Sequence, residues 1–284
     1  MLNNEPLTYV SNEEKQMIVD AIWKDIHDKQ TQLSQQVSPK AFVLGGQPGA
    51  GKSTSTDKLE IGYKKNIITI DLDSYRARHP NYQALYEKYG KELSSYTHQF
   101  AGEIKDKIQK RAVDNKYNII IDGTLGNLDR TEQLINNLKN NDYQVYVLIH
   151  TCSKDISWNS VNNRYENALK AGEIPRHVPK EVHDQIVESL PKNVDKLSQS
   201  TKIEYLIVHN REEKIYDSRI DNSLPSIAIQ AEMNKNKLSK NNLTQSSNEA
   251  FSKVRQLATK KLDSKESLLN QKSLNKSTDK GVER

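Results

Sequence analysis

Short apolar runs alternate along the chain with longer segments of mixed polarity. The runs span residues 41–44, 67–70, 118–121, 145–149 and 205–208. They are rich in β-branched residues and too short for buried helices, which favours buried strands. Segments between them, such as 53–65 and 99–113, are long enough for helices. This alternation predicts an α/β fold in three layers, with a mostly parallel central sheet covered by helices on both faces.

Helical patterns flank this core on both sides. Ser11 to Glu14 reads S-x-x-E, a capping box, and apolar residues follow it at helical spacing. After about residue 225 the chain becomes rich in Lys, Asn, Ser and Gln, with an amphipathic stretch at 248–269 and a final dozen residues of disordered composition. We therefore expect three parts: an N-terminal helical segment packed on the core at 1–40, a main domain at 41–225 and a basic, helical to disordered tail at 226–284.

Glycine, aspartate and threonine cluster at the ends of three predicted strands. Gly45 and Gly46 stop the first strand, Asp71 and Asp73 follow the second, and a D-G-T run beginning at Asp122 follows the third. Parallel sheets bind ligands at the carboxyl ends of their strands. These clusters therefore predict where the chemistry takes place.

Composition narrows the class of protein. Of 284 residues 35% are hydrophobic and 28% charged, no run approaches the roughly 18 apolar residues of a membrane span, and the first ten residues lack secretory-signal features. A single cysteine, Cys152, excludes an internal disulfide framework and a cysteine-rich zinc site. We expect a soluble, cytoplasmic protein without stable membrane association.

The net charge of +5 is unevenly distributed. Residues 233–284 hold 12 basic and 5 acidic side chains, a net of +7, which leaves a net of −2 for the rest of the chain. Binding along nucleic acid phosphates requires cations clustered on the folded part. No nucleic acid partner is therefore expected.

The first glycine cluster opens a complete phosphate-binding loop. Residues 46–53 match G-x-x-x-x-G-K-[ST] in full. The glycines let backbone amides turn toward a phosphate, and the helix that follows adds the positive end of its dipole. In such a loop the lysine reaches the β- and γ-phosphates and the serine hydroxyl binds Mg²⁺. We expect a nucleoside triphosphate to be held by Gly46, Gln47, Pro48, Gly49, Ala50, Gly51, Lys52 and Ser53.

Aspartates at the sheet edge are candidates for proton transfer and metal binding. In small-molecule kinases a carboxylate beside the phosphate loop accepts the proton of the acceptor hydroxyl. With the phosphate loop upstream, this role is preferred for Asp73 over a simple turn or helix cap. Asp122 fits an acid that steadies Mg²⁺ or its water, but a helix cap for the segment beginning at Thr124 fits equally well. Which of Asp71, Asp73 and Asp122 touches the metal stays open.

Phosphoryl transfer also requires cations, because negative charge spreads over the oxygens of the migrating group. Arg164 and Arg176 lie where a lid is expected, and Pro175 and Pro179 stiffen the loop around Arg176. Read alone, these arginines and Glu103 are more often solvated surface charges.

Several motifs in this order resemble the zeta toxin family of bacterial toxin–antitoxin modules. They are the phosphate loop, I-D-L-D at 70–73, H-P-N at 79–81, I-D-G-T at 121–124, and N-R-Y-E at 163–166 with an arginine at 176. S-L-P-K-N at 189–193 and N-R-E at 210–212 look similar too. The resemblance covers residues 10 to 260, and the order of the motifs is more specific than the phosphate loop alone.

The resemblance implies an ATP-dependent kinase that phosphorylates the 3′-hydroxyl of UDP-N-acetylglucosamine and so inhibits peptidoglycan synthesis. It implies Mg²⁺ as cofactor and a cognate antitoxin protein that blocks the nucleotide site. The roles it implies are ATP and Mg²⁺ binding by Lys52 and Ser53, the general base Asp73, substrate contacts from Glu103 and Thr124, and phosphate-stabilising Arg164 and Arg176.

One departure from the family pattern concerns the acceptor. Family members often carry an arginine just after the G-T element, where this chain has Gly126. Either Arg130 reaches back to supply that cation, or the affinity or preference for the sugar nucleotide is altered. A P-loop kinase of another small hydroxyl acceptor (an antibiotic, a nucleotide or another nucleotide sugar) stays open. A non-catalytic ATP-binding interaction protein has less support.

Overall fold

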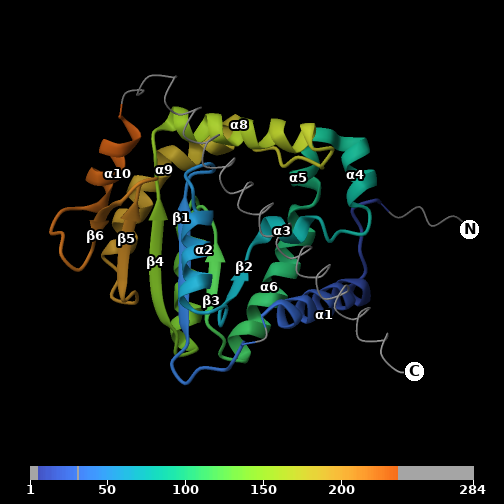
Figure 1. Ribbon diagram of the computed structural model, residues 1–284, viewed down its shortest axis with the longest axis horizontal. Coiled ribbons are helices and arrows are strands. Elements are labelled where there is room, and N and C mark those ends of the chain that lie inside the picture. The colour runs from blue at the N-terminus through green and yellow to red at the C-terminus, as the bar shows by residue number, and fades with distance from the viewer. Residues whose placement is uncertain (1–5, 31, 236–284) are drawn as a thin grey trace, which may run out of the picture. The chain divides into compact units, whose positions relative to one another are not determined.

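The centre of the fold is a six-stranded sheet with strand order β2-β3-β1-β4-β5-β6 (Figure 1). The computed structural model describes residues 6–30 and 32–235. The parallel strands are β1 (Lys40–Gly46), β2 (Ile68–Ile70), β3 (Ile119–Asp122), β4 (Gln144–His150) and β5 (Tyr205–His209). β6 (Lys214–Asp217) runs antiparallel to β5. The prediction of an α/β fold with a mostly parallel sheet is confirmed.

Helices occupy the segments between the strands. They are α1 (Asn12–Lys29), α2 (Ser53–Gly62), α3 (Leu72–Arg76), α4 (Tyr82–Tyr89), α5 (Leu93–Tyr96), α6 (His98–Asp114), α7 (Leu128–Asn140), α8 (Lys154–Lys170), α9 (Lys180–Ser198) and α10 (Pro225–Met233), with a 3₁₀ turn η1 (Gly90–Glu92). α8 runs along the top of the view, above the carboxyl ends of the strands (Figure 1). None of the helices in the described part combines the length and the apolar character needed to cross a membrane.

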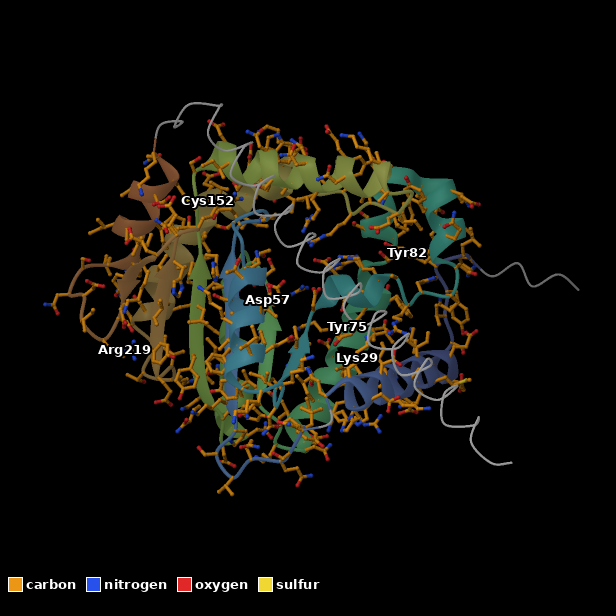
Figure 2. The ribbon with its side chains drawn as sticks, in the orientation of Figure 1. Lys29, Asp57, Tyr75, Tyr82, Cys152 and Arg219 are labelled. Atoms are coloured by element: carbon orange, nitrogen blue, oxygen red, sulfur yellow. The ribbon has the colours of Figure 1, made fainter. Side chains whose placement is uncertain are left out.

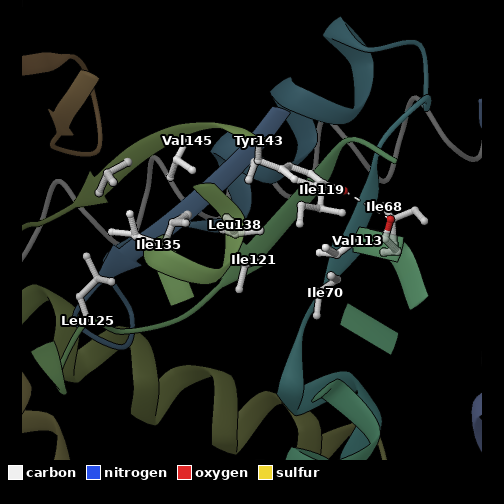
Figure 3. Close-up of a cluster of buried hydrophobic side chains, with 14 of the residues drawn as sticks. Ile68, Ile70, Val113, Ile119, Ile121, Leu125, Ile135, Leu138, Tyr143 and Val145 are labelled. Carbon is white, nitrogen blue, oxygen red and sulfur yellow. Dashed lines mark hydrogen bonds between the residues drawn. The ribbon is translucent and has the colours of Figure 1, made fainter. Parts of the chain in front are cut away.

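Alternate residues of β1, β3, β4 and β5 enter two separate cores. Val43 of β1 and Ile121 of β3 belong to the larger core, which side chains of α6, α7 and α9 complete and which Figure 3 shows in part. Phe42 and Ile120 point to the other face, where Leu59 of α2 packs against them. Because both faces are covered, the strands read as unbroken apolar runs rather than as alternating ones.

The N-terminal helix is fixed by the capping box that its sequence predicts. The Ser11 hydroxyl accepts from the Glu14 amide at 3.1 Å, and the Ser11 amide donates to the Glu14 carboxylate at 2.9 Å. Val19 and Ile22 of α1 are buried in the larger core, which α6 also lines. At the other end, α10 begins at Pro225 and packs against α9. The helix predicted at 248–269 and the disordered end lie outside the described residues, and the three-part division stays a prediction.

β6 is the strand that the hydrophobic pattern misses. Its four residues read K-I-Y-D, with two apolar side chains beside a polar turn. Its place is secured by Tyr216 and by Asp217, which are both buried. The Asp217 carboxylate accepts from Arg219 at 2.6 and 2.8 Å and from Lys214 at 2.8 Å. These ion pairs lie within β6 and the turn after it, and they offset the cost of burying the Asp217 carboxylate without leaving an apolar signature in the sequence.

Two stacked imidazoles lie beneath α2 and predict a loss of stability in acid. The His150 and His209 rings are 5.5 Å apart, and His150 Nε2 lies 2.8 Å from the Ser55 hydroxyl. Burial, with smaller contributions from His209 and Lys52, lowers the pKa of His150 from 6.5 to about 4. The unfolded chain therefore takes up this proton first, so stability present above pH 6.5 is lost as the pH falls toward 4.

Between pH 7 and pH 5 we expect His150 to remove about 2 kcal/mol from the free energy of unfolding. Urea unfolding at the two pH values measures this loss. The variant His150→Gln, which cannot take up a proton, should lose about that much less over the same interval. An equal loss in the variant and the original protein would contradict the assignment.

Candidate active site

The segment between β1 and α2 forms the predicted phosphate loop, held between β4 and α8. The strand continues through Gly46 rather than stopping before it, which lengthens the predicted run. Gly46 and Gly49 both have positive φ, and a Cβ would collide with the carbonyl oxygen of His150 at the first and of Ser157 at the second. Only glycine fits at such positions. Gln47 is fully buried and donates to the Cys152 carbonyl at 2.7 Å, near the upper end of β4 in Figure 2.

Lys52 folds back onto the loop that precedes it. Its Nζ donates to the Gly46 carbonyl at 3.0 Å and to the Gln47 carbonyl at 3.3 Å. Burial lowers the pKa of Lys52, and the negative charge of Asp122 opposes this most strongly. Ser53, the first residue of α2, is exposed. The pKa of Lys52 is also influenced by the charges of four nearby side chains, Asp122, Arg176, Arg164 and Asp73.

The two aspartates after β2 have different surroundings. Asp71 caps α3, since its Oδ1 accepts from the Asp73 amide at 2.9 Å, and burial raises the pKa of its carboxyl. Asp73 lies in the first turn of α3, with Oδ1 3.0 Å from Arg76 Nε and Oδ2 paired with Arg176. The turn role therefore falls to Asp71, and the Asp73 carboxylate is free of any capping duty in α3.

Asp122, the last residue of β3, has a carboxylate oxygen without a hydrogen-bond partner among the described residues. Its Oδ1 is buried and makes no hydrogen bond within the described part of the chain. Burial raises the pKa of Asp122, and Lys52 is the largest opposing influence. The cap of α7 is Asn127, whose side chain accepts from the Arg130 amide at 3.0 Å, so Asp122 is not a helix cap.

An orphaned carboxylate oxygen beside the phosphate loop fits a hard cation such as Mg²⁺. Ser53 offers a hydroxyl at the start of α2, as the loop motif predicts. Within residues 6–30 and 32–235, no group of three or more His, Cys, Asp or Glu side chains could hold a metal ion by itself. Mg²⁺ is usually bound by one or two protein groups together with substrate phosphates.

Within the described residues, the structure does not bring the side chains of the two predicted substrate contacts, Thr124 and Glu103, into hydrogen-bonding contact with the cluster around Lys52. Thr124 lies in the loop after β3, and its hydroxyl accepts from the Gly126 amide at 3.3 Å. Glu103 lies on α6, where it pairs with Lys15 of α1 at 2.7 Å and accepts from Gln99 at 3.0 Å. These bonds go to α1 and to its own helix rather than to the cluster around Lys52. A substrate role for Glu103 stays a prediction.

The two predicted arginines approach the site from its α8 side. Arg164 lies on α8 and Arg176 in the segment between α8 and α9, which is neither helix nor strand. The Arg164 guanidinium interacts electrostatically with Arg176 and Asp73. Residues from five separate segments, Lys52, Asp73, Asp122, Arg164 and Arg176, are thus within electrostatic reach of one another.

The sequence patterns assign no role to two arginines and a tyrosine that lie at the site. Arg76 binds Asp73 from one helical turn further along. Tyr82 of α4, labelled in Figure 2, lies within electrostatic range of Arg76, Asp73 and Arg176. Arg211, in the turn between β5 and β6, donates at 2.6 Å both to the Gly49 carbonyl and to a serine of α8. The D-x-x-R spacing predicts a contact between Arg76 and Asp73 only if both residues are known to lie in one helix, because side chains three positions apart share a helix face.

Comparison with known proteins identifies relatives of the whole described domain. The sequence model of the family described as "Zeta toxin" matches residues 24–221. Toxin PezT of Streptococcus pneumoniae serotype 4 is 35% identical over 183 residues, covering 64% of this chain and 72% of that protein. Toxin zeta of Streptococcus agalactiae is 30% identical over 201 residues, 70% of each chain. A solved structure of the PezAT chromosomal toxin–antitoxin system of S. pneumoniae superimposes with a TM-score of 0.74 at 25% identity, covering 89% of this chain and 100% of that one.

Proposed function

Because the chain belongs to the zeta toxin family, we propose that it is a toxin that uses ATP to phosphorylate the 3′-hydroxyl of UDP-N-acetylglucosamine. The product would inhibit peptidoglycan synthesis. The observation that carries the proposal is the convergence of Lys52 and Asp73, a donor-binding cation and a candidate base, beside two further arginines. A donor phosphate held by the loop would then meet an acceptor hydroxyl held against the carboxylate.

Donor binding requires Lys52 to exchange partners. In the structure its Nζ is occupied by the carbonyls of Gly46 and Gln47, which keep the ammonium at the mouth of the loop. A triphosphate offers charged oxygens in their place, which make stronger hydrogen bonds with an ammonium. Asp122 and Ser53 would hold Mg²⁺, which neutralises phosphate charge when bound.

Proton transfer requires Asp73 to release one of its two arginines. Arg176 occupies Oδ2, the oxygen not bound by Arg76. The transferring phosphoryl group carries more negative charge than a carboxylate and would draw Arg176 and Arg164 toward it. Asp73 Oδ2 is then available to accept the proton of the acceptor hydroxyl, so donor binding prepares the base.

The acceptor's diphosphate needs a cation, and we propose Arg130 for this role. Burial lowers the pKa of His98, and the positive charges of Arg76 and Arg130 lower it further. The Arg130 charge therefore reaches the side of the site on which Arg76 and Asp73 lie, consistent with its replacing the arginine missing at Gly126.

We expect Arg130→Ala to raise KM for UDP-N-acetylglucosamine about tenfold with little change in kcat, since one charge-assisted contact to the bound acceptor is lost. Initial rates at varied acceptor and saturating ATP measure the effect. Arg111→Ala, which removes an exposed arginine paired with Asp20, is the matched control and should leave KM unchanged. Equal KM values in the two variants would contradict a binding role for Arg130.

Mass spectrometry after incubation with ATP tests the proposed reaction. UDP-N-acetylglucosamine should gain one phosphate on the amino sugar, and the rate of this gain should fall steeply in Asp73→Asn. A panel containing antibiotics, nucleotides and other nucleotide sugars tests the alternative acceptors in the same assay. Phosphate on another acceptor alone would replace the proposed substrate, and ATP binding without any transfer would overturn the kinase proposal.

We further propose a cognate antitoxin protein that covers the nucleotide site in the cytoplasm. The support is the similarity to the solved toxin–antitoxin system described above. Expression of the toxin alone should arrest bacterial growth, and co-expression with the product of a small neighbouring gene should restore it. Restored growth without any loss of ATP binding would contradict blocking of the nucleotide site.

A further inference from the structure

The Asp73 carboxylate lies between two arginines that are held in different ways. Arg76 Nε donates to Oδ1 at 3.0 Å, and Arg176 pairs with Oδ2. The Arg76 side chain is 11% exposed, whereas that of Arg176 is 37% exposed. The difference in burial corresponds to a difference in anchoring.

Arg76 is tied to the framework at two further points. Its NH1 group donates to the Ser94 carbonyl at 2.6 Å and to the Thr97 hydroxyl at 3.1 Å. Thr97 is fully buried and in turn donates to the Leu93 carbonyl at 2.9 Å. The guanidinium therefore links Asp73 to the α5 segment through groups that do not belong to α3.

Arg176 has no comparable anchor. Over the residues that the structure describes, its ion pair with Asp73 is the one hydrogen-bonding or ionic contact found for its side chain. It lies in the irregular segment between α8 and α9. Arg176 can therefore leave Asp73 for a phosphoryl group, whereas Arg76 cannot leave without breaking two other bonds.

We propose that Arg76 is a positioning residue that fixes the Asp73 carboxylate for proton transfer once Arg176 has left it. The proposal rests on the proposed function, because it takes Asp73 as the base. With Arg76 in place, Oδ1 stays bound and Oδ2 keeps its direction toward the acceptor. Without it, the carboxylate rotates freely, and a misplacement of about 1 Å costs about a hundredfold in rate.

Kinetic comparison of three variants tests the proposal. Arg76→Ala should lower kcat about 50-fold while KM for ATP and for the acceptor changes less than about threefold, because neither substrate is bound by Arg76. Arg76→Lys should recover part of the rate, since an ammonium reaches fewer of the three acceptors than a planar guanidinium does. The matched control is Arg78→Ala, which removes an exposed arginine two residues along, paired with Asp25, and should leave kcat unchanged.

A double mutant separates positioning from a structural role. In an Asp73→Asn background, Arg76→Ala should lower kcat no further, because the group that it positions is already absent. Added guanidinium ion should restore part of the rate of Arg76→Ala but not of the double mutant. Full additivity of the two substitutions, or a kcat for both Arg76 variants equal to that of Arg78→Ala, would overturn the proposal.

Two further measurements test the role of Arg76 if Arg76→Ala does not fold or if the proposed acceptor is not modified. If Arg76→Ala does not fold, Arg76→Lys, which retains a cation at this position, decides by the same kcat criterion. If the original protein leaves UDP-N-acetylglucosamine unmodified, the proposed function fails in its acceptor, and arrest of bacterial growth replaces turnover as the readout. Arg76 variants that arrest growth as strongly as Arg78→Ala would then overturn the positioning role independently.

Discussion

Asp73→Asn is expected to lower kcat for phosphoryl transfer about a thousandfold. An amide of the same shape cannot accept the acceptor's proton, and general base catalysis contributes about 10²- to 10⁴-fold. The substitution also removes the negative charge between Arg76 and Arg176, so both guanidinium groups lose an ionic partner. Quantified formation of the phosphorylated sugar nucleotide under saturating substrates measures the loss.

The matched control for this substitution is Asp25→Asn. Asp25 also pairs with an arginine, at 2.6 Å, but on the exposed side of α1. It should retain full turnover, and both variants should unfold cooperatively on heating. Turnover of Asp73→Asn within about tenfold of the original protein would remove Asp73 from the role of base.

Lys52→Met is expected to lower kcat up to about a thousandfold. The ammonium is the buried cation of the phosphate loop, and losing one preorganised charge from a transition state typically costs about 10²- to 10³-fold. Methionine keeps much of the side-chain length without the charge, and it leaves the carbonyls of Gly46 and Gln47 without their donor. Turnover assays combined with titration of a fluorescent ATP analogue measure the effect on chemistry and on binding.

Lys58→Met on the same helix is the control for Lys52→Met. Lys58 is exposed and lies more than one turn further along α2. It should bind ATP and turn over as the original protein does. If Lys52→Met retained both ATP binding and turnover, the donor would have to bind elsewhere.

The sheet could be predicted from sequence because its strands are buried on both faces. The apolar run at 41–44 lies within β1, which extends it by Lys40 at one end and by Gly45 and Gly46 at the other. The run at 118–121 is shifted by one residue relative to β3, Ile119–Asp122. β6 escaped because it has only two apolar residues, and the local ion pairs of its buried Asp217 with Lys214 and Arg219 leave no apolar pattern. Local apolar pattern therefore locates the centre of this fold better than its edge.

The site was predictable where its chemistry has a fixed local spacing. The phosphate loop and the family resemblance, which is confirmed, depend on short ordered motifs. Arg76 reaches Asp73 locally, but the groups that anchor it, Ser94 and Thr97, lie 18 and 21 positions away. Arg211 reaches Gly49 across 162 positions. The pairing of Glu103 with Lys15 likewise joins α6 to α1 across 88 positions. No window of sequence contains such contacts.

The sheet terminates on a short strand at each of its two edges. The edge strands are β2, with three residues, and β6, with four. Each therefore exposes few unpaired backbone amides and carbonyls with which a strand of another molecule could pair. Long, flat, apolar margins invite neighbouring molecules to add on and aggregate. At high concentration, this protein should consequently resist strand-to-strand association, even though its interior strands are almost wholly apolar.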